Sequence, residues 1–203
     1  MNDDAQQSAY GSYVLALAAL TASFTVAAPN MCLPVLFKEI SQELQLSLVQ
    51  IGAIWGMAPL AGMFSGLIGG MLGDRFGTRR TLTVLCLLVG AAGASRGLAG
   101  DFLTLAAAVL LCGLLFPAIP TNLHKTCGIW FSGRHLGLAN GVASMGMALG
   151  FMLGSLISAT YLSPWLGGWR NVLFLYGGIA IAISVPWLLL REPPAQVTTT
   201  ATR

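Results

Sequence analysis

The densest group of charged side chains lies within residues 70–80, where Asp74 is followed by Arg75, Arg79 and Arg80. A carboxylate beside several guanidinium groups can form salt bridges that hold one conformation of a protein and break in another. We therefore predict a conformational gate. The alternative is a solvated turn that only fixes membrane topology through its positive charge. The gate is favoured because exposed ion pairs contribute only about 0–1 kcal/mol, so a solvated turn would not require this arrangement.

The turn that carries these charges also has a defined glycine pattern. Gly70 and Gly73 narrow the end of the preceding helix, and Gly77 permits a tight change of direction. Arg134, in a later polar segment, is the expected local partner of the Asp74 carboxylate. The predicted gating motif comprises Gly70, Asp74, Arg75, Gly77, Arg79, Arg80 and Arg134.

Polar side chains inside the apolar runs are the second group that can do chemistry. These runs contain no Asp or Glu, which removes the usual acidic members of a proton relay. His124 and Lys125 can attract an anionic solute or titrate, or both can extend to the lipid headgroups. Trp55 and Met57 can line a path or simply pack. The predicted cavity residues are Thr25, Asn30, Thr121, Asn122, His124, Lys125 and Asn140, although amides also bridge packed helices.

Enzymatic chemistry is not indicated by the sequence. It contains no pairing of a nucleophile with a base and no cluster of the metal-ligand type. The cysteines lie in different segments and are expected to be small buried hydrophobic residues. We predict neither a cofactor nor a metal, and the net charge of +3 gives no indication of nucleic-acid binding.

These side chains must be positioned by helices that lie in a membrane. Of the 203 residues, 56% are hydrophobic and only 8% are charged, against about 25% charged in a soluble domain. Six apolar runs are long enough to cross a hydrocarbon core of roughly 30 Å. They lack the alternating polarity of barrel strands, so helices are predicted. The predicted spans are residues 12–31, 48–72, 80–99, 102–123, 136–160 and 171–190.

The distribution of basic residues predicts the orientation of these spans. With the N-terminus placed inside, the inner side holds seven Lys or Arg residues and the outer side holds three, Lys38, Arg96 and Arg170. Because cytoplasmic loops are enriched in basic residues, we predict a multi-pass protein of the plasma or inner membrane with both termini in the cytoplasm. The inner residues are Arg75, Arg79, Arg80, Lys125, Arg134, Arg191 and Arg203.

The two ends of the chain flank a single predicted bundle over residues 12–190. Residues 1–11 contain Asp3 and Asp4 but no basic residue, so they are predicted to be a cytoplasmic N-terminus rather than a cleavable signal peptide. Residues 191–203 contain two prolines and a threonine-rich stretch. They are predicted to be a disordered tail or the start of a linker.

The two halves of the predicted bundle show weak internal symmetry. The first span carries Pro29 beside Asn30, and the fourth carries Pro120 shortly before Asn122. Interrupted helices at matching places of two repeats point to a transport site, although prolines also simply bend packed helices. The second and fifth spans carry glycines at four-residue spacing, which gives smooth faces for close packing in lipid. These faces include Gly62, Gly66 and Gly70 in the second span and Gly146, Gly150 and Gly154 in the fifth.

Residues 70–80 closely resemble the signature loop of the major facilitator superfamily. That loop reads glycine, three residues, aspartate, a basic residue, any residue, glycine, any residue and two basic residues, and every specified position is met. It lies between the predicted second and third helices, as in that family. The resemblance covers nearly the whole chain and continues at Trp130, Phe131, Arg134, Gly137, Ala139, Asn140, Gly141, Gly146, Gly168, Trp169 and Arg170.

The resemblance implies an all-α integral membrane fold of six transmembrane helices, arranged as two inverted three-helix repeats. This is half of the twelve-helix fold of the family, so the chain is either a fragment or pairs with a second six-helix half or with a copy of itself. The chain departs from the family near Leu111, Cys112 and Gly113, where many members carry a helix-four arginine. This departure argues against proton coupling through this half.

Two functions from different classes follow from these observations. The resemblance implies a subunit or half of a secondary transporter that moves a small polar or anionic solute by alternating access. The alternative is a membrane partner or regulator of a full-length permease that itself moves nothing. If the chain pairs with itself, we predict that the glycine faces form the contact, so that Gly150→Leu weakens self-association more than Gly178→Leu.

Overall fold

The computed structural model describes residues 2–190, and within them it is all-helical without strands. Five helical segments are long and apolar enough to cross a membrane. A sixth is obtained when Leu48–Met63 and Ser65–Phe76, which meet at a bend of 42°, are taken as one broken span. The all-α membrane fold predicted from the sequence is therefore confirmed. The predicted tail over residues 191–203 lies outside the described residues.

The helices follow the predicted spans in order and extend beyond several of them, because helices continue past the apolar core that hydropathy detects. The first three spans are α1 (Asn2–Thr21) with the π-helix η1 (Ala22–Ala27) and α2 (Ala28–Leu44), then α3 (Leu48–Phe76), then α4 (Thr78–Ser95) with the short η2 (Arg96–Leu98). The last three are α5 (Phe102–Leu115) with α6 (Ala118–Trp130), α7 (Gly133–Ile157) with η3 (Ser158–Leu162) and α8 (Ser163–Leu166), and α9 (Trp169–Leu189).

Two spans begin where the sequence supplies a helix cap. The Ser47 hydroxyl accepts a hydrogen bond from the Gln50 backbone N–H, and the Gln50 side chain accepts one from the Ser47 N–H in return. Asp101 and Thr104 form the same reciprocal pair at the start of α5. These bonds satisfy backbone donors that the first helical turn leaves free. They explain why α3 and α5 begin at residues 48 and 102, as predicted.

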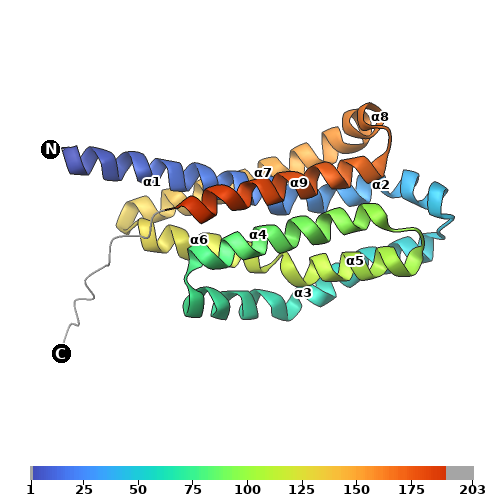
Figure 1. Ribbon diagram of the computed structural model, residues 1–203, viewed down its shortest axis with the longest axis horizontal. Helices are drawn as coiled ribbons and strands as arrows, with labels where there is room; N and C mark the ends of the chain where they lie inside the picture. Colours follow the sequence, from blue (N-terminus) through green and yellow to red (C-terminus); the bar gives the residue numbers. More distant parts are fainter. Residues whose placement is uncertain (1, 191–203) are drawn as a thin grey trace.

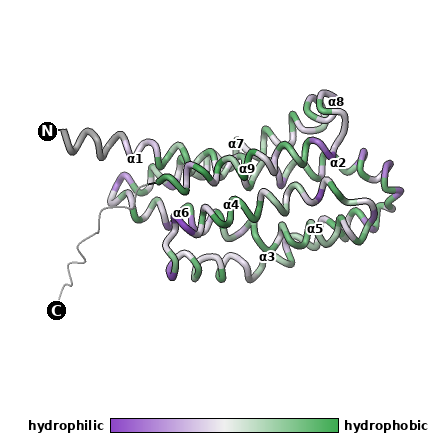
Figure 2. Tube along the Cα trace, viewed as in Figure 1, coloured by the Kyte–Doolittle hydropathy of each residue, from purple (hydrophilic) through white to green (hydrophobic). Residues whose placement is uncertain are grey.

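The long axes of the helices run roughly along one direction, so the loops gather at the two ends of the bundle (Figure 1). The α3–α4 turn and the α6–α7 loop lie at the end where α1 begins and α9 finishes. The α2–α3, α4–α5 and α8–α9 connections lie at the opposite end. Hydrophilic residues are concentrated toward these ends, whereas apolar residues dominate the middle (Figure 2). This is the distribution that a lipid bilayer requires.

The glycine faces of the second and fifth spans pack inside the bundle. A Cβ atom on Gly146, Gly150 or Gly154 of α7 would lie 2.5–2.6 Å from a backbone oxygen of the first span. On α3, a Cβ at Gly62 would lie 3.0 Å from Pro117 Cγ of the fourth span. The prediction that these glycines form a contact with a second copy was therefore wrong. They allow close helix contacts within one chain.

The way the spans pack on one another also reveals the two repeats. The second span packs on the fourth and the fifth packs on the first, while α4 and α9, the third helices of the two repeats, form the most extensive contact. At the α4–α9 contact, a Cβ on Gly90 would lie 2.8 Å from Gly177 O, and one on Gly177 would lie 2.7 Å from Gly90 O. This reciprocal arrangement is what two repeats related by an approximate two-fold axis produce.

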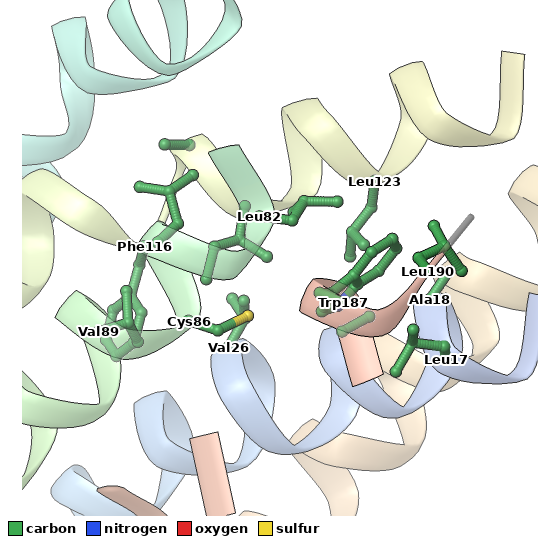
Figure 3. Packing of buried hydrophobic residues seen from close by; sticks show 14 of the residues in the cluster. Leu17, Ala18, Val26, Leu82, Cys86, Val89, Phe116, Leu123, Trp187 and Leu190 are labelled. Atoms are coloured by element: carbon green, nitrogen blue, oxygen red, sulfur yellow. The ribbon is translucent and has the colours of Figure 1, made fainter. Parts of the chain in front are cut away.

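Buried side chains of the first, third, fourth and sixth spans form an apolar cluster inside the bundle. The Trp187 indole lies at 0% exposure in this cluster, and its Nε1–H donates to Thr21 Oγ1 at 2.9 Å. That bond satisfies the only polar group of a large side chain in an apolar setting. Figure 3 shows ten members of the cluster by name: Leu17, Ala18, Val26, Leu82, Cys86, Val89, Phe116, Leu123, Trp187 and Leu190.

Candidate functional site

The charged turn between α3 and α4 depends on Gly77. This residue has φ +83°, a conformation that side-chain-bearing residues rarely adopt, so glycine is required for the tight turn. Its N–H donates to Gly73 O at 3.0 Å, and its carbonyl accepts from Thr81 N–H at 3.1 Å. The last turn of α3 is thereby joined directly to the first turn of α4.

Asp74 forms an ion pair with a residue of α6. Lys125 Nζ lies 2.7 Å from Asp74 Oδ1 and donates a second hydrogen bond to Gly70 O, also at 2.7 Å. The Asp74 side chain is 72% exposed and that of Lys125 is 31% exposed. The prediction that Arg134 pairs with Asp74 was wrong, because the ammonium group of α6 lies beside the end of α3 whereas Arg134 is exposed on α7.

Lys125 can reach both acceptors because it passes over a glycine. A Cβ atom on Gly70 would lie 3.3 Å from Thr121 Cγ2 and 3.5 Å from Lys125 Nζ. The missing side chain lets the ammonium group approach the Gly70 carbonyl as well as the carboxylate. Lys125 is thus held at the end of α3 by these two hydrogen bonds.

The arginines of the turn make separate contacts. Arg79 Nη2 donates to Leu188 O in the last turn of α9 at 2.5 Å, where the negative end of the helix dipole favours a cation. The Arg75 guanidinium lies 5.5 Å from the centre of the Phe76 ring. Arg80 is exposed and borders an apolar groove with Leu72 and Phe76. The turn therefore joins α3 to α6 through Asp74, and α4 to α9 through Arg79.

Asn122 lies between α3 and α6 and does not face a cavity. Its side chain is 0% exposed, and Nδ2 donates to Gly69 O and to Ala118 O, each at 2.8 Å. Thr25 is also fully buried, within η1. Thr121 is partly buried, and its hydroxyl donates to Pro117 O at 3.1 Å. Asn122 therefore bridges two packed helices, which was the alternative left open for amide side chains.

His124 and Asn140 form a second polar link at the same end of the bundle. His124 Nδ1 lies 3.0 Å from Asn140 Oδ1, which connects α6 to α7. Of the predicted cavity residues, these two therefore meet each other, whereas Lys125 meets Asp74. Asn122, His124, Lys125 and Asn140 thus make bonds between spans, whereas Asn30 lines the cavity described next.

A cavity of about 400 Å³ lies between the first, second and fourth spans. Asn30 and Trp55 both belong to its wall, and Trp55 also packs edge-on against the Phe37 ring. Met57 instead packs against a buried apolar cluster. The other lining residues are Ala58, Pro59, Gly62, Met63, Gly113, Phe116 and Pro117. A concave, mostly apolar wall with one or two polar groups is typical of a small-molecule site.

The burial of Arg96 was not predicted from the sequence. Arg96 was assigned to the outer side, near the end of the predicted span over residues 80–99, but its side chain is only 2% exposed and turns back into the bundle from η2. The signal available in the sequence was its position next to a long uncharged run, with only a few small residues before the next helix begins at Phe102.

A polar cluster at the opposite end from the charged turn was also missed. Arg170 Nε lies 3.0 Å from Glu43 Oε1, and its Nη1 donates to Gly97 O and Ala99 O at 2.8 and 2.6 Å. Trp169 Nε1 donates to Glu43 Oε2 at 2.6 Å. These bonds tie together the ends of α2, η2 and α9.

Comparison with known proteins gives a consistent assignment. The model of the Major Facilitator Superfamily matches residues 15–203. A 3-(3-hydroxy-phenyl)propionate transporter of Escherichia coli K12 is 31% identical over 162 residues, which cover 78% of this chain and 38% of that protein. The probable sulfoacetate transporter SauU of Cupriavidus necator is 24% identical over 151 residues, covering 74% of this chain and 34% of that protein.

Two further relatives cover most of the chain. A probable galactarate/D-glucarate transporter of E. coli K12, GarP, is 22% identical over 199 residues, which cover 95% of this chain and 44% of that protein. The crystal structure of a bacterial homologue of the human lysosomal transporter Spinster, inward-facing and occupied, is similar with a TM-score of 0.74 at 20% identity. It covers 91% of this chain and 45% of the other. The chain thus spans less than half the length of these relatives.

The match over residues 15–203, the complete charged turn and the paired three-helix repeats agree with one another. This chain belongs to the major facilitator superfamily and represents its N-terminal six-helix half.

Proposed function

We propose that the chain is half of a secondary transporter that moves a small organic anion across the membrane by alternating access. The relatives supply the main support, because each is named as a transporter of an organic acid. Carboxylates and sulfonates are negatively charged at neutral pH. The cavity beside Asn30 and Trp55 provides a concave wall of suitable size for such a solute.

The ion pair between Asp74 and Lys125 is the proposed gate element. It ties the end of α3 to α6 with a bond of 2.7 Å while remaining accessible to water at the Asp74 side chain. An exposed pair of this kind contributes about 0–1 kcal/mol, so it can break and re-form during a conformational cycle without a large barrier. Such a pair can bias an equilibrium between two states of similar free energy.

A second six-helix unit is the proposed partner, either another half or a copy of this chain. Spanning less than half the length of its relatives, the chain supplies one wall of the transport path. Large apolar side chains are exposed on α3 and α7, among them Leu60, Met63, Leu67, Met145, Met152 and Leu156. Such apolar faces can contact either lipid or another protein, because both provide surroundings that do not solvate charged groups.

Uptake by reconstituted protein tests the proposal. The chain is purified, placed in proteoliposomes, and supplied with radiolabelled 3-(3-hydroxyphenyl)propionate, sulfoacetate or D-glucarate, called here the anion panel. Saturable uptake of at least one anion above empty liposomes is the expected result. Specific binding without uptake by the chain alone would mean that a second half is required. Neither binding nor uptake would contradict the proposal and favour a regulator of another permease.

A further inference from the structure

Arg96 places a guanidinium group deep inside the bundle. Its side chain is 2% exposed at the end of α4, yet it turns inward rather than to the surface. Arg96 Nε donates to Gly93 O at 3.3 Å, and Nη1 donates to Pro29 O at 3.2 Å. The first bond stays within the third span, and the second links the third span to the first.

This cation has no negative partner among the described residues. Its contacts are two neutral carbonyls and the face of the Phe116 ring, 5.9 Å from Cζ. The ion pairs found within residues 2–190 involve other side chains, and Arg96 Nη2 is buried without a hydrogen-bond partner there. Burying an uncompensated charge is costly. An ionisable residue retained at membrane depth is therefore a candidate for ligand binding.

The neighbours of Arg96 form the wall of the cavity. Phe116 lines the cavity, and the Arg96 guanidinium lies against the Phe116 ring. Pro29, which accepts the Nη1 hydrogen bond, is followed by the cavity residue Asn30. The cavity lining itself carries no charged side chain. Arg96 is thus a charged group whose contacts include the cavity residue Phe116 and the residue that precedes Asn30.

The Arg96 guanidinium also lies beside the fourth span, which carries no arginine of its own. The sequence has no arginine near Leu111, Cys112 and Gly113. Phe116, one helical turn after Cys112, receives the Arg96 guanidinium against its ring. A cation is therefore present beside the fourth span in space, although it is distant in sequence.

We propose that Arg96 binds the anionic group of the transported solute, and that the Phe116 ring covers its guanidinium when the cavity is empty. The inference rests on the proposed transport of an organic anion and identifies the residue that selects the charge. When the ring turns aside, the free Nη2 donates to a carboxylate or sulfonate oxygen. The anion then supplies both the missing acceptor and the missing negative charge.

Binding measurements on the purified chain in detergent test this role. Each anion of the panel and its uncharged amide are titrated by calorimetry into the wild type, Arg96→Gln and Arg96→Lys. For an anion that binds the wild type, Arg96→Gln should weaken binding about ten- to a hundredfold. Binding of the amide should change much less. Arg96→Lys should recover part of the affinity, since it keeps the charge but not the planar fork.

Lys38→Gln is the matched control, because it removes a positive charge from an exposed position of α2 that is not part of the cavity wall. It should bind the anions as the wild type does. Equal affinity of the wild type and Arg96→Gln for the anion would overturn the inference while leaving anion transport intact. A wild type that binds none of the panel contradicts both the inference and the proposed function.

Phe116→Leu provides a test that does not require removal of Arg96. It keeps an apolar residue of similar volume but removes the ring face that covers the guanidinium. The ratio of anion to amide affinity should rise severalfold. An unchanged ratio would contradict the inference even if Arg96→Gln does not fold.

Discussion

At the scale of single residues, the ion pair of Asp74 shows how the fold chooses among possible partners. Several arginines lie near Asp74 in sequence, but its carboxylate bonds to Lys125 from α6. The choice follows from the close approach of α6 to α3, which the missing side chain of Gly70 permits. The lysine ammonium group then donates one hydrogen bond to the carboxylate and another to the Gly70 carbonyl. Glycine and aspartate in the motif are thus parts of one contact.

Removal of the Asp74 charge should loosen this end of the bundle without unfolding it. We expect Asp74→Asn to lower the free energy of unfolding by no more than about 1 kcal/mol, because the pair is largely solvated. We also expect the ends of α3 and α6 to exchange amide hydrogens faster. Thermal melting in detergent and hydrogen exchange measure the two effects.

A double-mutant cycle separates the pair from other effects of each residue. Asp74→Asn and Lys125→Gln together should cost less than the sum of the single changes, because each single change already removes the same bond. Arg134→Gln serves as the control, since Arg134 is exposed and makes no contact with Asp74 in the described structure. Additive costs for the first pair would show that the bond does not contribute in solution.

The sequence picks out the polar and charged residues inside the bundle, but it does not predict which groups their side chains contact. Asn30, a predicted cavity residue, lines the cavity together with Trp55, for which the sequence left lining and packing equally open. Thr25 and Asn122 are buried between helices instead. The burial of Arg96 was not predicted because hydropathy reports where a charge lies along the chain but not where its long side chain points. Side-chain direction requires the packing of neighbouring helices.

At the scale of helices, the glycine faces determine how closely the spans approach. A Cβ on Gly150 would lie 2.5 Å from Ser23 O, whereas Gly178 of α9 has open space around the same position. Gly150→Ala should therefore lower the free energy of unfolding by about 1–3 kcal/mol through overpacking. Gly178→Ala should leave it unchanged or slightly higher. Thermal melting of the two variants in one detergent makes the comparison, and equal melting temperatures would contradict the packing described here.

The cap at the start of α5 should respond to acid. Bonds from the Thr104 backbone N–H and hydroxyl lower the pKa of Asp101 below its ordinary value. The carboxylate therefore stabilises α5 above the unfolded-state pKa, and this contribution is lost as the pH falls through the lower folded-state pKa. Hydrogen exchange at the Thr104 amide, corrected for its intrinsic pH dependence, should show protection decreasing on acidification.

Asp101→Asn is the matched control for this effect. An asparagine still caps a helix but does not titrate in this range. Protection of the Thr104 amide in this variant should be independent of pH once intrinsic exchange is removed. The same acid response in the variant and the wild type would assign the change to another group.

Helix starts were easier to predict than interruptions within helices. Ser47 and Asp101 are capping residues whose effect is local, so the starts of α3 and α5 follow from the sequence. The π-helix over Ala22–Ala27 was not predicted. Pro29 has no N–H to offer the carbonyl of Thr25 four residues earlier, and the chain here also packs against α7. The sequence shows the proline, but whether the helix responds with a π-helical turn depends on how it packs against its neighbours.

At the scale of the whole molecule, the reciprocal packing makes the six spans one body. The second helix of each repeat lies against the first helix of the other, and the third helices cross at Gly90 and Gly177. Polar clusters lie at both ends, with Glu43 and Arg170 at one and Asp74 and Lys125 at the other. A half built in this way is suited to move as a unit against a second half, as alternating access requires.

The arrangement of the loops leads to a prediction of topology. The loop that contains Gly100 lies at one end of the bundle, and the loop that contains Ser132 lies at the other (Figure 1). Basic residues favour the cytoplasm for the end that holds the charged turn and Ser132. Burial of Arg96 removes one residue from the count on the outer side, which strengthens the asymmetry. We therefore expect Gly100 outside and Ser132 inside.

Cysteine labelling in intact cells tests this orientation with little background, because Cys32, Cys86, Cys112 and Cys127 are all buried. A membrane-impermeant maleimide should label Gly100→Cys from outside, since this position is exposed and has open space around it. It should label Ser132→Cys, also at an exposed position, only after the membrane is permeabilised. Labelling of both positions in intact cells would contradict a six-span bundle with loops at opposite faces, and the reverse pattern would place the charged turn outside. Only the expected pattern puts the Asp74–Lys125 pair at the cytoplasmic mouth, where the proposed gate has to act.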